Sequence, residues 1–297
     1  MFIDGVFSGG GIKGFALIGA VMEAEQRGYT FKRVAGTSAG ALIAGLLAAG
    51  YSGAEINLLM EDVELTKLLE TKKQQTFPFA RWLKLYWRMG LYKGDALENW
   101  IKEMLARKNI RTFADLPNQN LRIIASDLTN GRLIVLPDDL PNYQLSAEKF
   151  SVAKAIRMSC SVPFFFEPIT IKTNGQKSVF VDGGVLSNFP MWLFDKENVM
   201  TVRPVLGFKL VPEDQMIHQR NVNNAVELFT SLFETMKNAH DSRYISRKIV
   251  KNIMFIPVKE TSFVDFSISE EQRRGLIESG RMSAAHFLEH WFYRKRN

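Results

Sequence analysis

Short apolar runs alternate with longer helical segments along most of the chain. The runs Phe2–Ser8, Phe31–Ala35 and Leu121–Ser126 are short and bounded by turn residues, which is typical of buried strands. Phe15–Ala24 and the apolar stretch Ala39–Ala49 follow the first two runs and have the length of helices. This alternation of strands with helices predicts an α/β fold.

The later part of the chain continues the same alternation. Asn130-Gly131 predicts a tight hairpin turn that joins Leu121–Ser126 to a strand at Leu133–Leu136. Further predicted elements are a helix at Ala147–Met158, strands at Val179–Asp182, Leu206–Leu210 and Ile253–Pro257, and a long helical region at Asn221–Val250. With no internal repeat and no obvious linker, we expect one domain over residues 1–297, with residues 261–297 as a C-terminal helical extension.

One uncharged stretch has the length of a membrane span. Val34–Ala54 carries no charged residue, but five glycines interrupt it, and its purely apolar part is only Ala39–Ala49. That length suits a buried core helix, and Gly50 is a natural helix stop. We therefore expect a soluble or peripheral protein without an integral membrane segment.

Composition narrows the class of protein further. The 297 residues, 46% of them hydrophobic, can bury a large core. The single cysteine, Cys160, forms no intrachain disulfide, and Met1–Gly11 has no basic leader, so we expect a cytoplasmic location. No zinc-type or EF-hand spacing occurs, and we expect neither a metal nor a cofactor. The net charge of +7 favours anionic surfaces, and without a nucleic-acid motif a lipid surface is the better partner.

A serine stands at the junction of a predicted strand and a predicted helix. Gly36-Thr37-Ser38-Ala39-Gly40 has the G-x-S-x-G pattern of a nucleophile elbow, in which glycines let strand and helix approach closely. The N-terminus of the following helix would stabilise negative charge on Ser38 and on a bound oxyanion. The alternative is that Ser38 only caps the helix, as serine commonly does.

A glycine-rich loop follows the first predicted strand. In Gly9-Gly10-Gly11-Ile12-Lys13-Gly14, successive backbone N–H groups without bulky side chains form an anion-binding nest, which can serve as an oxyanion hole. The carboxyl ends of parallel strands lie at one edge of a sheet, so this loop is expected to meet Ser38 there.

The same loop fits a second function. Gly9-x-Gly11-x-x-Gly14 matches the dinucleotide-binding fingerprint, which would make the protein an oxidoreductase. That fingerprint expects an acidic residue after the second strand, whereas this chain has Lys32 and Arg33 before that strand. An arginine can accommodate a 2′-phosphate, so this alternative stays open.

A serine nucleophile also needs a base. The candidates are the histidines in the last third of the chain and Asp182 in an Asp-Gly-Gly turn; the histidines are His218, His240, His286 and His290. At its reference pKa of about 3.9 an aspartate is a weak base, so its surroundings must assist it. The residues alone leave this choice open.

Three blocks in order resemble the signature of the patatin-like phospholipases. They are the Gly9–Gly14 loop, Gly36–Gly40 and Asp182-Gly183-Gly184; lesser matches are Gly94–Leu97, Ser126–Gly131, Ser159–Pro163 and Asn188–Pro190. The resemblance spans about residues 3–260. It implies a three-layer α/β/α fold with a mixed, largely parallel central sheet, and a lipid acyl hydrolase with a Ser–Asp dyad.

The resemblance also implies roles for individual residues. Ser38 would be the nucleophile, Asp182 the base, and the amides of Gly10, Gly11 and Ile12 the oxyanion hole of an enzyme that forms an acyl-enzyme, similar to a phospholipase A or lysophospholipase. The supporting positions are Gly9, Lys13, Gly14, Gly36, Gly40, Gly183 and Gly184. The substrate would be a phospholipid or another acyl-ester lipid, and a non-catalytic lipid-binding protein of the same fold is the remaining alternative.

Two segments bear on the acyl pocket and on membrane contact. Phe164–Phe166 is bulkier than the family pattern leads us to expect. In Phe77–Tyr92 three aromatic residues are interleaved with three cations, as in an interfacial helix, although an ordinary amphipathic helix explains the pattern equally well.

Overall fold

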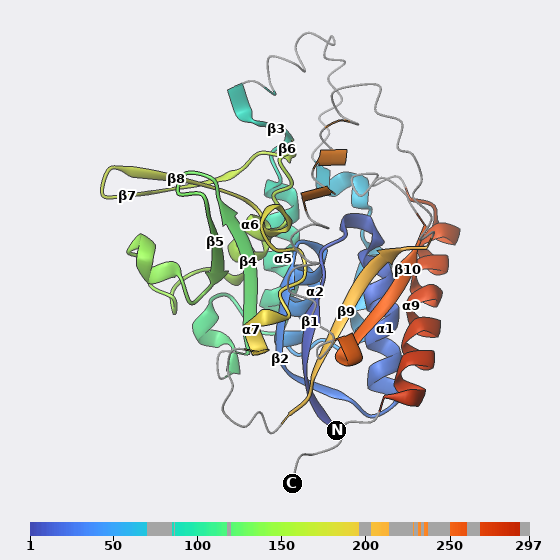
Figure 1. The fold of residues 1–297 in the computed structure, drawn as a ribbon. Helices are drawn as coiled ribbons and strands as arrows, with labels where there is room; N and C mark the ends of the chain where they lie inside the picture. Colours follow the sequence, from blue (N-terminus) through green and yellow to red (C-terminus); the bar gives the residue numbers. More distant parts are fainter. Residues whose placement is uncertain are drawn as a thin grey trace.

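An eight-stranded mixed sheet forms the centre of the molecule (Figure 1). The computed structural model describes residues 1–69, 85, 87–117, 120–195, 203–213, 228, 231–232, 235–236, 250–259 and 268–291. The strands of the sheet are β1 (Phe2–Phe7), β2 (Thr30–Thr37), β4 (Leu121–Asp127), β5 (Arg132–Leu136), β7 (Ile169–Thr173), β8 (Gln176–Asp182), β9 (Val205–Pro212) and β10 (Ile253–Val258). A separate pair consists of β3 (Gly90–Tyr92) and β6 (Phe164–Phe166).

Helices cover both faces of the sheet. They are α1 (Phe15–Gln26), α2 (Ala39–Ala48), α3 (Gly53–Asp62), α5 (Asp95–Arg107), α6 (Val152–Ser159), α7 (Trp192–Asp195) and α9 (Glu270–His290). Short 3-10 turns are η1 (Gly11–Gly14), η2 (Leu65–Leu69), η3 (Phe113–Asp115), η5 (Leu140–Tyr143), η6 (Gly183–Val185) and η7 (Val250–Asn252).

The strand order is β10-β9-β1-β2-β4-β8-β7, and β5 also pairs with β4. The first five strands are parallel, whereas β5, β7 and β8 add antiparallel pairs. The predicted α/β fold with a mixed, largely parallel sheet is therefore confirmed. Parallel neighbours need crossover helices, which α1 supplies between β1 and β2.

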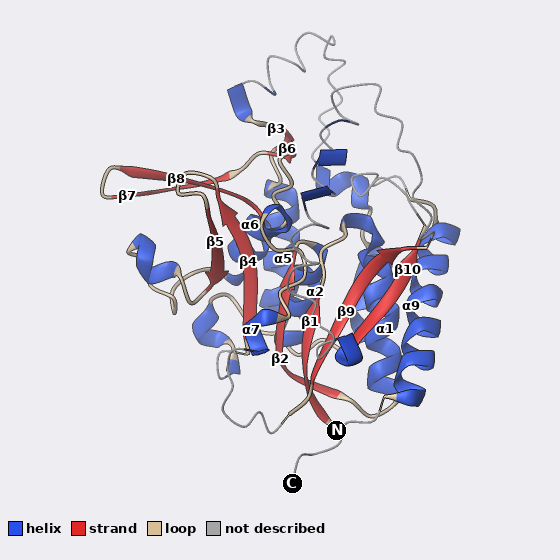
Figure 2. Cartoon of the chain, viewed as in Figure 1, coloured by secondary structure: helices blue, strands red, loops and turns tan. Residues whose placement is uncertain are grey.

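Alternation along β1 assigns the two faces of the sheet. Ile3 and Phe7 belong to the large core under the main helical layer (Figure 2), whereas Val6 packs in a second cluster with Phe189 and Phe194. The second face is thus covered by the segment that ends in α7, which supplies the third layer of the fold.

Helices α1 and α9 lie in close contact at two glycines. A Cβ at Gly19 would fall on the backbone oxygen of Ile277, and a Cβ at Gly280 would fall on that of Ala16. The long C-terminal helix is thereby packed against the helix that follows the glycine-rich loop. The sequence predicted helical character beyond residue 260 without predicting this contact.

Two details depart from the predicted elements. The helix expected at Ala147–Met158 begins at Val152, because Ser151 caps it by accepting a hydrogen bond from Lys154 N at 3.3 Å. The helix expected over Phe77–Tyr92 is wrong at its end, where β3 pairs with β6. Most of that segment, and most of the helical region predicted at Asn221–Val250, lies outside the described residues.

Among the described helices, none combines the length and the apolarity that a membrane crossing requires.

Candidate active site

Ser38 sits in a backbone conformation that few residues adopt. Its φ is 55° and its ψ is −125°, at the point where β2 stops and α2 begins. The flanking glycines are required because there is no room for a side chain at either position. A Cβ at Gly36 would fall on the backbone oxygen of Gly40, and a Cβ at Gly40 would fall on the backbone oxygens of Phe7 and Ser8. The side chain of Ser38 makes no capping hydrogen bond to α2. The turn therefore has the geometry of a nucleophile elbow rather than of an ordinary helix cap.

Two strands meet end to end beside Ser38. Strand β5 occupies one edge of β4, so β2 and β8 share the other edge, β2 running parallel to β4 and β8 antiparallel. Thr37 lies opposite Ile124, and Asp182 lies opposite the next residue, Ala125. Neighbouring residues of a strand are about 3.3 Å apart. The register thus brings the ends of β2 and β8 together, and with them Ser38 and Asp182.

The last residue of α6, Ser159, and the residue after it, Cys160, hold the backbone on both sides of this junction. Ser159 Oγ accepts a hydrogen bond from Ser38 N at 2.9 Å and donates one to Ile124 O at 2.6 Å. Cys160 Sγ donates to Ser38 O at 3.3 Å. The N–H group of Ser38 is therefore tied to Ser159 and its carbonyl group to Cys160, and the sequence analysis assigned a function to neither residue.

Asp182 is 1% exposed and belongs to the same cluster. Its N–H donates to Ser161 O at 2.8 Å, and its Oδ1 accepts from Gly184 N at 2.7 Å. Burial raises the pKa of the Cys160 thiol, and the nearby Asp182 carboxylate raises it further. Cys160 is thus a neutral neighbour of both residues. A Cβ at Gly183 would fall on Ile124 O, which explains the first glycine of the Asp-Gly-Gly turn.

The glycine-rich loop packs against the elbow. A Cβ at Gly9 would lie 3.1 Å from Ser38 Cβ, and one at Gly14 would lie 2.9 Å from Ala39 Cβ. Gly11 has a φ of 55°, and the turn η1 begins there. The first N–H groups of a helical turn have no acceptor within it, so those of Gly11 and Ile12 are directed to other groups. Lys13 follows in η1 and is half-buried.

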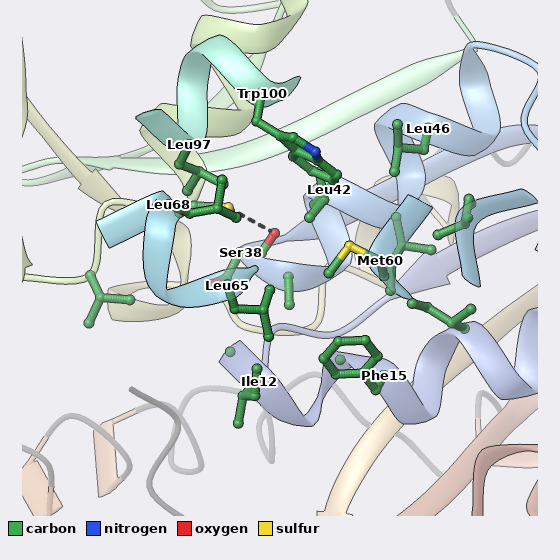
Figure 3. A pocket seen from close by; sticks show the side chains of 18 of the residues that line it. Ile12, Phe15, Ser38, Leu42, Leu46, Met60, Leu65, Leu68, Leu97 and Trp100 are labelled. Carbon is green, nitrogen blue, oxygen red and sulfur yellow. Dashed lines mark hydrogen bonds between the residues drawn. The ribbon is translucent and has the colours of Figure 1, made fainter. Parts of the chain in front are cut away.

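An apolar cavity of about 100 Å³ opens beside Ser38 (Figure 3). None of the described residues that line it has a charged side chain; they include Gly11, Ile12, Phe15, Leu42, Trp100 and Cys160. Phe165 and Phe166 also line it, so the bulky run Phe164–Phe166 does shape this cavity. The hydroxyl of Ser38 is the polar feature toward which these side chains converge, and Ser38 itself is only 7% exposed.

Two other buried polar side chains close to the site, Asp127 and Arg157, form hydrogen bonds that stabilise the fold. Asp127 accepts hydrogen bonds from Thr129 N, Asn130 and Tyr143 OH, the last at 2.6 Å. Burial favours its neutral form, but these hydrogen bonds outweigh burial and hold its pKa below the ordinary value. Arg157, also buried, donates to the carbonyls of Gly94 and Glu167 at 3.0 Å and so fixes the strand pair that walls the cavity.

The histidines lie elsewhere. His286 and His290 are exposed near the end of α9, where the neighbouring Trp291 contacts Tyr29 and Asn252 just before the starts of β2 and β10. They are therefore at the edge of the sheet opposite Ser38. His218 and His240 lie outside the described residues.

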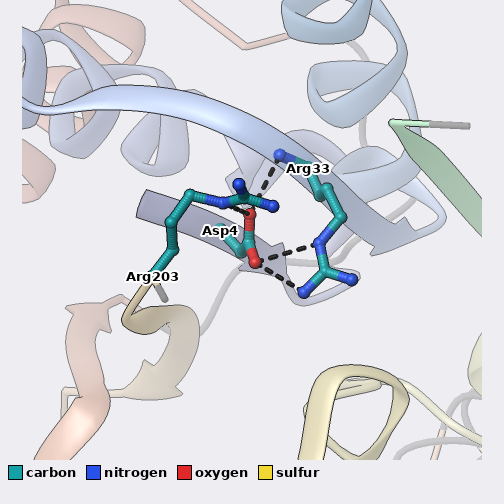
Figure 4. A network of polar contacts seen from close by, with 3 residues as sticks. All are labelled: Asp4, Arg33 and Arg203. Atoms are coloured by element: carbon teal, nitrogen blue, oxygen red, sulfur yellow. Dashed lines mark hydrogen bonds and ion pairs between the residues drawn. The ribbon is translucent and has the colours of Figure 1, made fainter. Parts of the chain in front are cut away.

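The structure also weakens the dinucleotide alternative, because Arg33, the arginine considered for a 2′-phosphate, is engaged elsewhere. Arg33 donates to the buried carboxylate of Asp4 at 2.7 Å, and Arg203 joins the same carboxylate at 3.2 Å (Figure 4). This cluster is at the start of β1 and β2, far from the glycine-rich loop. Within the described part of the chain, no three His, Cys, Asp or Glu residues come together as a metal site.

Comparison with known proteins agrees with this geometry. The family model for patatin-like phospholipases matches residues 5–195, a range that contains the glycine-rich loop, Ser38 and Asp182. The chain belongs to the patatin-like phospholipase family. Membership places it among lipid hydrolases. The match ends before the segment from 196 to 260, which the resemblance was expected to include.

Relatives of this patatin-like chain occur in bacteria and viruses. It is 51% identical over 294 residues to the uncharacterized protein YqhO of Bacillus subtilis, covering 99% of this chain and 100% of that one. It is 28% identical to the cUMP-AMP-activated phospholipase of Escherichia coli, over 61% of this chain and 54% of the relative.

Solved structures share the fold. VipD of Legionella pneumophila matches with a TM-score of 0.59 and 20% identity, over 97% of this chain and 67% of VipD. ExoU of Pseudomonas aeruginosa, in complex with SpcU, matches with a TM-score of 0.53 and 17% identity, over 97% of this chain and 52% of ExoU.

Proposed function

We propose that this protein is a serine lipid acyl hydrolase with a Ser38–Asp182 dyad. The observation that carries the proposal is the register of β4, in which Ile124 and Ala125 face Thr37 and Asp182. The amides of Gly10, Gly11 and Ile12 supply the oxyanion hole. Gly11 and Ile12 support this role because both line the cavity that contains Ser38.

The first half of the reaction acylates the serine. Ser38 Oγ attacks the ester carbonyl carbon while its proton passes to the carboxylate of Asp182. The carbonyl oxygen becomes an oxyanion, which accepts hydrogen bonds from the loop amides. The tetrahedral intermediate then expels the alcohol oxygen, which takes the proton from Asp182 and leaves the acyl group on Ser38.

The second half returns the free enzyme. A water molecule gives a proton to Asp182 and attacks the acyl carbon, forming a second oxyanion in the same loop. Collapse of this intermediate releases the fatty acid, and Ser38 Oγ regains its proton from Asp182. No bond formed in this sequence requires a group other than the substrate, water and these side chains.

The cavity indicates which part of the ester enters it. The described residues of its wall are uncharged and match an acyl chain. An apolar cavity of about 150 Å³ holds one benzene ring, so about 100 Å³ corresponds to roughly four carbon atoms. A butyrate ester is thus the probe that fits the site without rearrangement.

A fluorophosphonate probe tests the dyad directly. We expect it to label Ser38, identified by mass spectrometry of the modified peptide, and we expect Ser38→Ala to abolish p-nitrophenyl butyrate hydrolysis. Asp182→Asn removes the proton acceptor and is expected to lower kcat by about 10⁴-fold or more, as loss of one member of a catalytic unit does elsewhere. Thermal unfolding of both variants checks that the fold is kept.

The matched controls are His286→Ala and His290→Ala, which remove histidines from the opposite edge of the sheet and should leave the rate unchanged. An inactive histidine variant would overturn the dyad. A chain that is folded but never labelled at Ser38 would instead be a non-catalytic lipid-binding protein.

Contact with a membrane surface is a further part of the proposal. Of the segment Phe77–Tyr92, the structure describes residues 85 and 87–92. Within these, Trp87 is 73% exposed, and Arg88 lies 3.5 Å from the carboxylate of Glu167. An exposed tryptophan beside a cation suits the interface of a bilayer, where such side chains are enriched.

A further inference from the structure

A second cavity lies on the other side of the glycine-rich loop. It measures about 640 Å³, within the range of small-molecule sites, and is much larger than the cavity beside Ser38. We call it the α9 groove, because its wall combines the start of α9 with the ends of β9 and β10. The residues that the argument uses are Ile12, Glu213, Lys259, Glu271, Gly275 and Leu276.

Ile12 is shared by the two cavities. Its backbone N–H is one of the proposed oxyanion donors, so a bound ester carbonyl would lie beside it. A carbonyl carbon carries the acyl chain on one side and the alcohol oxygen on the other. With the acyl chain in the apolar cavity, the alcohol part of the ester is therefore directed past Ile12 toward the α9 groove.

The two cavities differ in polarity, as the acyl half and the alcohol half of such an ester do. The described residues that line the cavity beside Ser38 are uncharged, whereas the α9 groove carries Lys259 together with the carboxylates of Glu213 and Glu271. Leu276 and Val258 add apolar surface to the wall of the groove. A polar group that bears both an anionic phosphate and a cationic ammonium matches such a wall better than a uniformly charged group does.

We propose that the α9 groove binds the leaving-group half of the substrate, a glycerophosphate head that carries a cationic amine. The inference rests on the proposed function for its catalytic consequence, since the groove would hold the alcohol that Ser38 displaces. It names the substrate class as a zwitterionic phospholipid.

Gly275 allows the groove to be filled selectively. A Cβ at this position meets none of the described residues within 4 Å, and the residue is exposed on α9. Gly275→Phe should therefore occupy the groove without a clash at its base. Gly275→Ala is the matched control, because it also replaces the helix glycine with a residue of higher helix propensity but does not fill the groove.

The activity test compares two butyrate esters. For dibutyroyl phosphatidylcholine, we expect Gly275→Phe to lower kcat/KM at least tenfold, mostly through KM. For p-nitrophenyl butyrate, whose leaving group is small, we expect a change of less than twofold. Gly275→Ala should leave both rates near those of the unmodified chain. Equal rates of phospholipid hydrolysis in the Phe and Ala variants would overturn the proposal.

A binding test separates this inference from the catalytic proposal. The full chain with Ser38→Ala is titrated with glycerophosphocholine in a calorimeter, which requires no turnover. We expect binding that weakens at least tenfold on adding Gly275→Phe or Lys259→Ala, the latter an exposed residue whose loss does not threaten the fold. Binding without any Ser38 labelling would uphold the groove and reject the dyad. Absence of glycerophosphocholine binding, with Ser38 labelled normally in the unmodified chain, would reject the groove alone.

Discussion

The two ends of the central sheet are closed by different chemistry. Where β1 and β2 begin, two arginines surround the buried carboxylate of Asp4. Where these strands stop, glycines bring backbones into contact, and the hydroxyl of Ser159 and the thiol of Cys160 hold the peptide groups of Ser38. The first end uses charge compensation to stabilise the fold. At the second end neutral groups and close approach hold the backbone of the elbow, and the proposed reaction would use the space and the backbone N–H groups there.

This difference separates stability from activity. A buried carboxylate paired with arginines is a structural device whose loss leaves cationic groups without their counter-ion. A strained serine held by neutral hydrogen bonds costs stability and is retained where it serves chemistry. Substitutions where the strands begin should therefore lower the free energy of unfolding. Substitutions where the strands stop should lower the rate of ester hydrolysis.

The largest effect is expected at Asp4. Asp4→Asn removes the charge that faces Arg33 and Arg203, and we expect the free energy of unfolding to fall by about 3 kcal/mol. This is the lower end of the range for breaking a buried pair, because both arginines are partly exposed. Urea unfolding gives the loss. The rate of butyrate ester hydrolysis per folded molecule should stay unchanged, and a fall in that rate would contradict the separation of the two ends.

A smaller effect concerns Asp127, which lies on β4 two positions beyond the residue that faces Asp182. Here a carboxylate near the site is held by neutral donors, one of them Tyr143. Burial, followed by the hydrogen bond to Asp127, raises the pKa of Tyr143 to about 12. A raised pKa contributes stability that is complete below the unfolded value of about 10 and is lost as pH rises toward 12.

We therefore expect the free energy of unfolding to fall by about 2 kcal/mol between pH 10 and pH 12 through Tyr143. Tyr143→Phe, which lacks the ionisable hydroxyl, is the matched control and should lose less stability over that interval. Parallel curves for the two proteins, measured by urea unfolding, would show that Tyr143 does not titrate as described.

Local patterns in the sequence were sufficient to predict half of the candidate site, namely the glycine-rich loop and the elbow. The glycine-rich loop and the elbow each lie within one strand–turn–helix unit, where glycine spacing and an apolar run define the geometry. Their meeting followed from the rule that parallel strands end at one edge of a sheet. The parallel strands β1, β2, β9 and β10 were predicted for the same reason, since each is a short apolar run.

The other half depends on register, which no local pattern contains. Asp182 lies near Ser38 because β8 runs antiparallel along the part of the β4 edge that β2 leaves free, and the sequence does not encode that choice in any one segment. The α9 groove draws on three strands or helices far apart in the chain. Pairing with β6 likewise made a strand of Gly90–Tyr92, where the helical spacing of charges predicted otherwise.

The smallest effect tests the comparison most directly. It distinguishes a role of the Ser159 hydroxyl in positioning Ser38 from a role in stabilising the fold. Ser159→Ala leaves Ser38 N–H and Ile124 C=O without their partner, and the elbow then loses one of its two ties. We expect the rates of fluorophosphonate labelling and of butyrate hydrolysis to fall about tenfold, equivalent to about 1.4 kcal/mol. The loss should appear in kcat rather than KM.

Ser161→Ala is the matched control for that prediction. Ser161 is equally buried on the same segment, but its hydroxyl bonds Arg157 instead of the elbow. We expect this variant to lose stability and keep kcat, whereas Ser159→Thr, which retains a hydroxyl, should recover most of the lost rate. If Ser159→Ala and Ser161→Ala lowered stability equally and both left kcat intact, the hydroxyl of Ser159 would be structural only. The two ends of the sheet would then differ in their residues, but the hydrogen bonds at both ends would serve only to stabilise the fold.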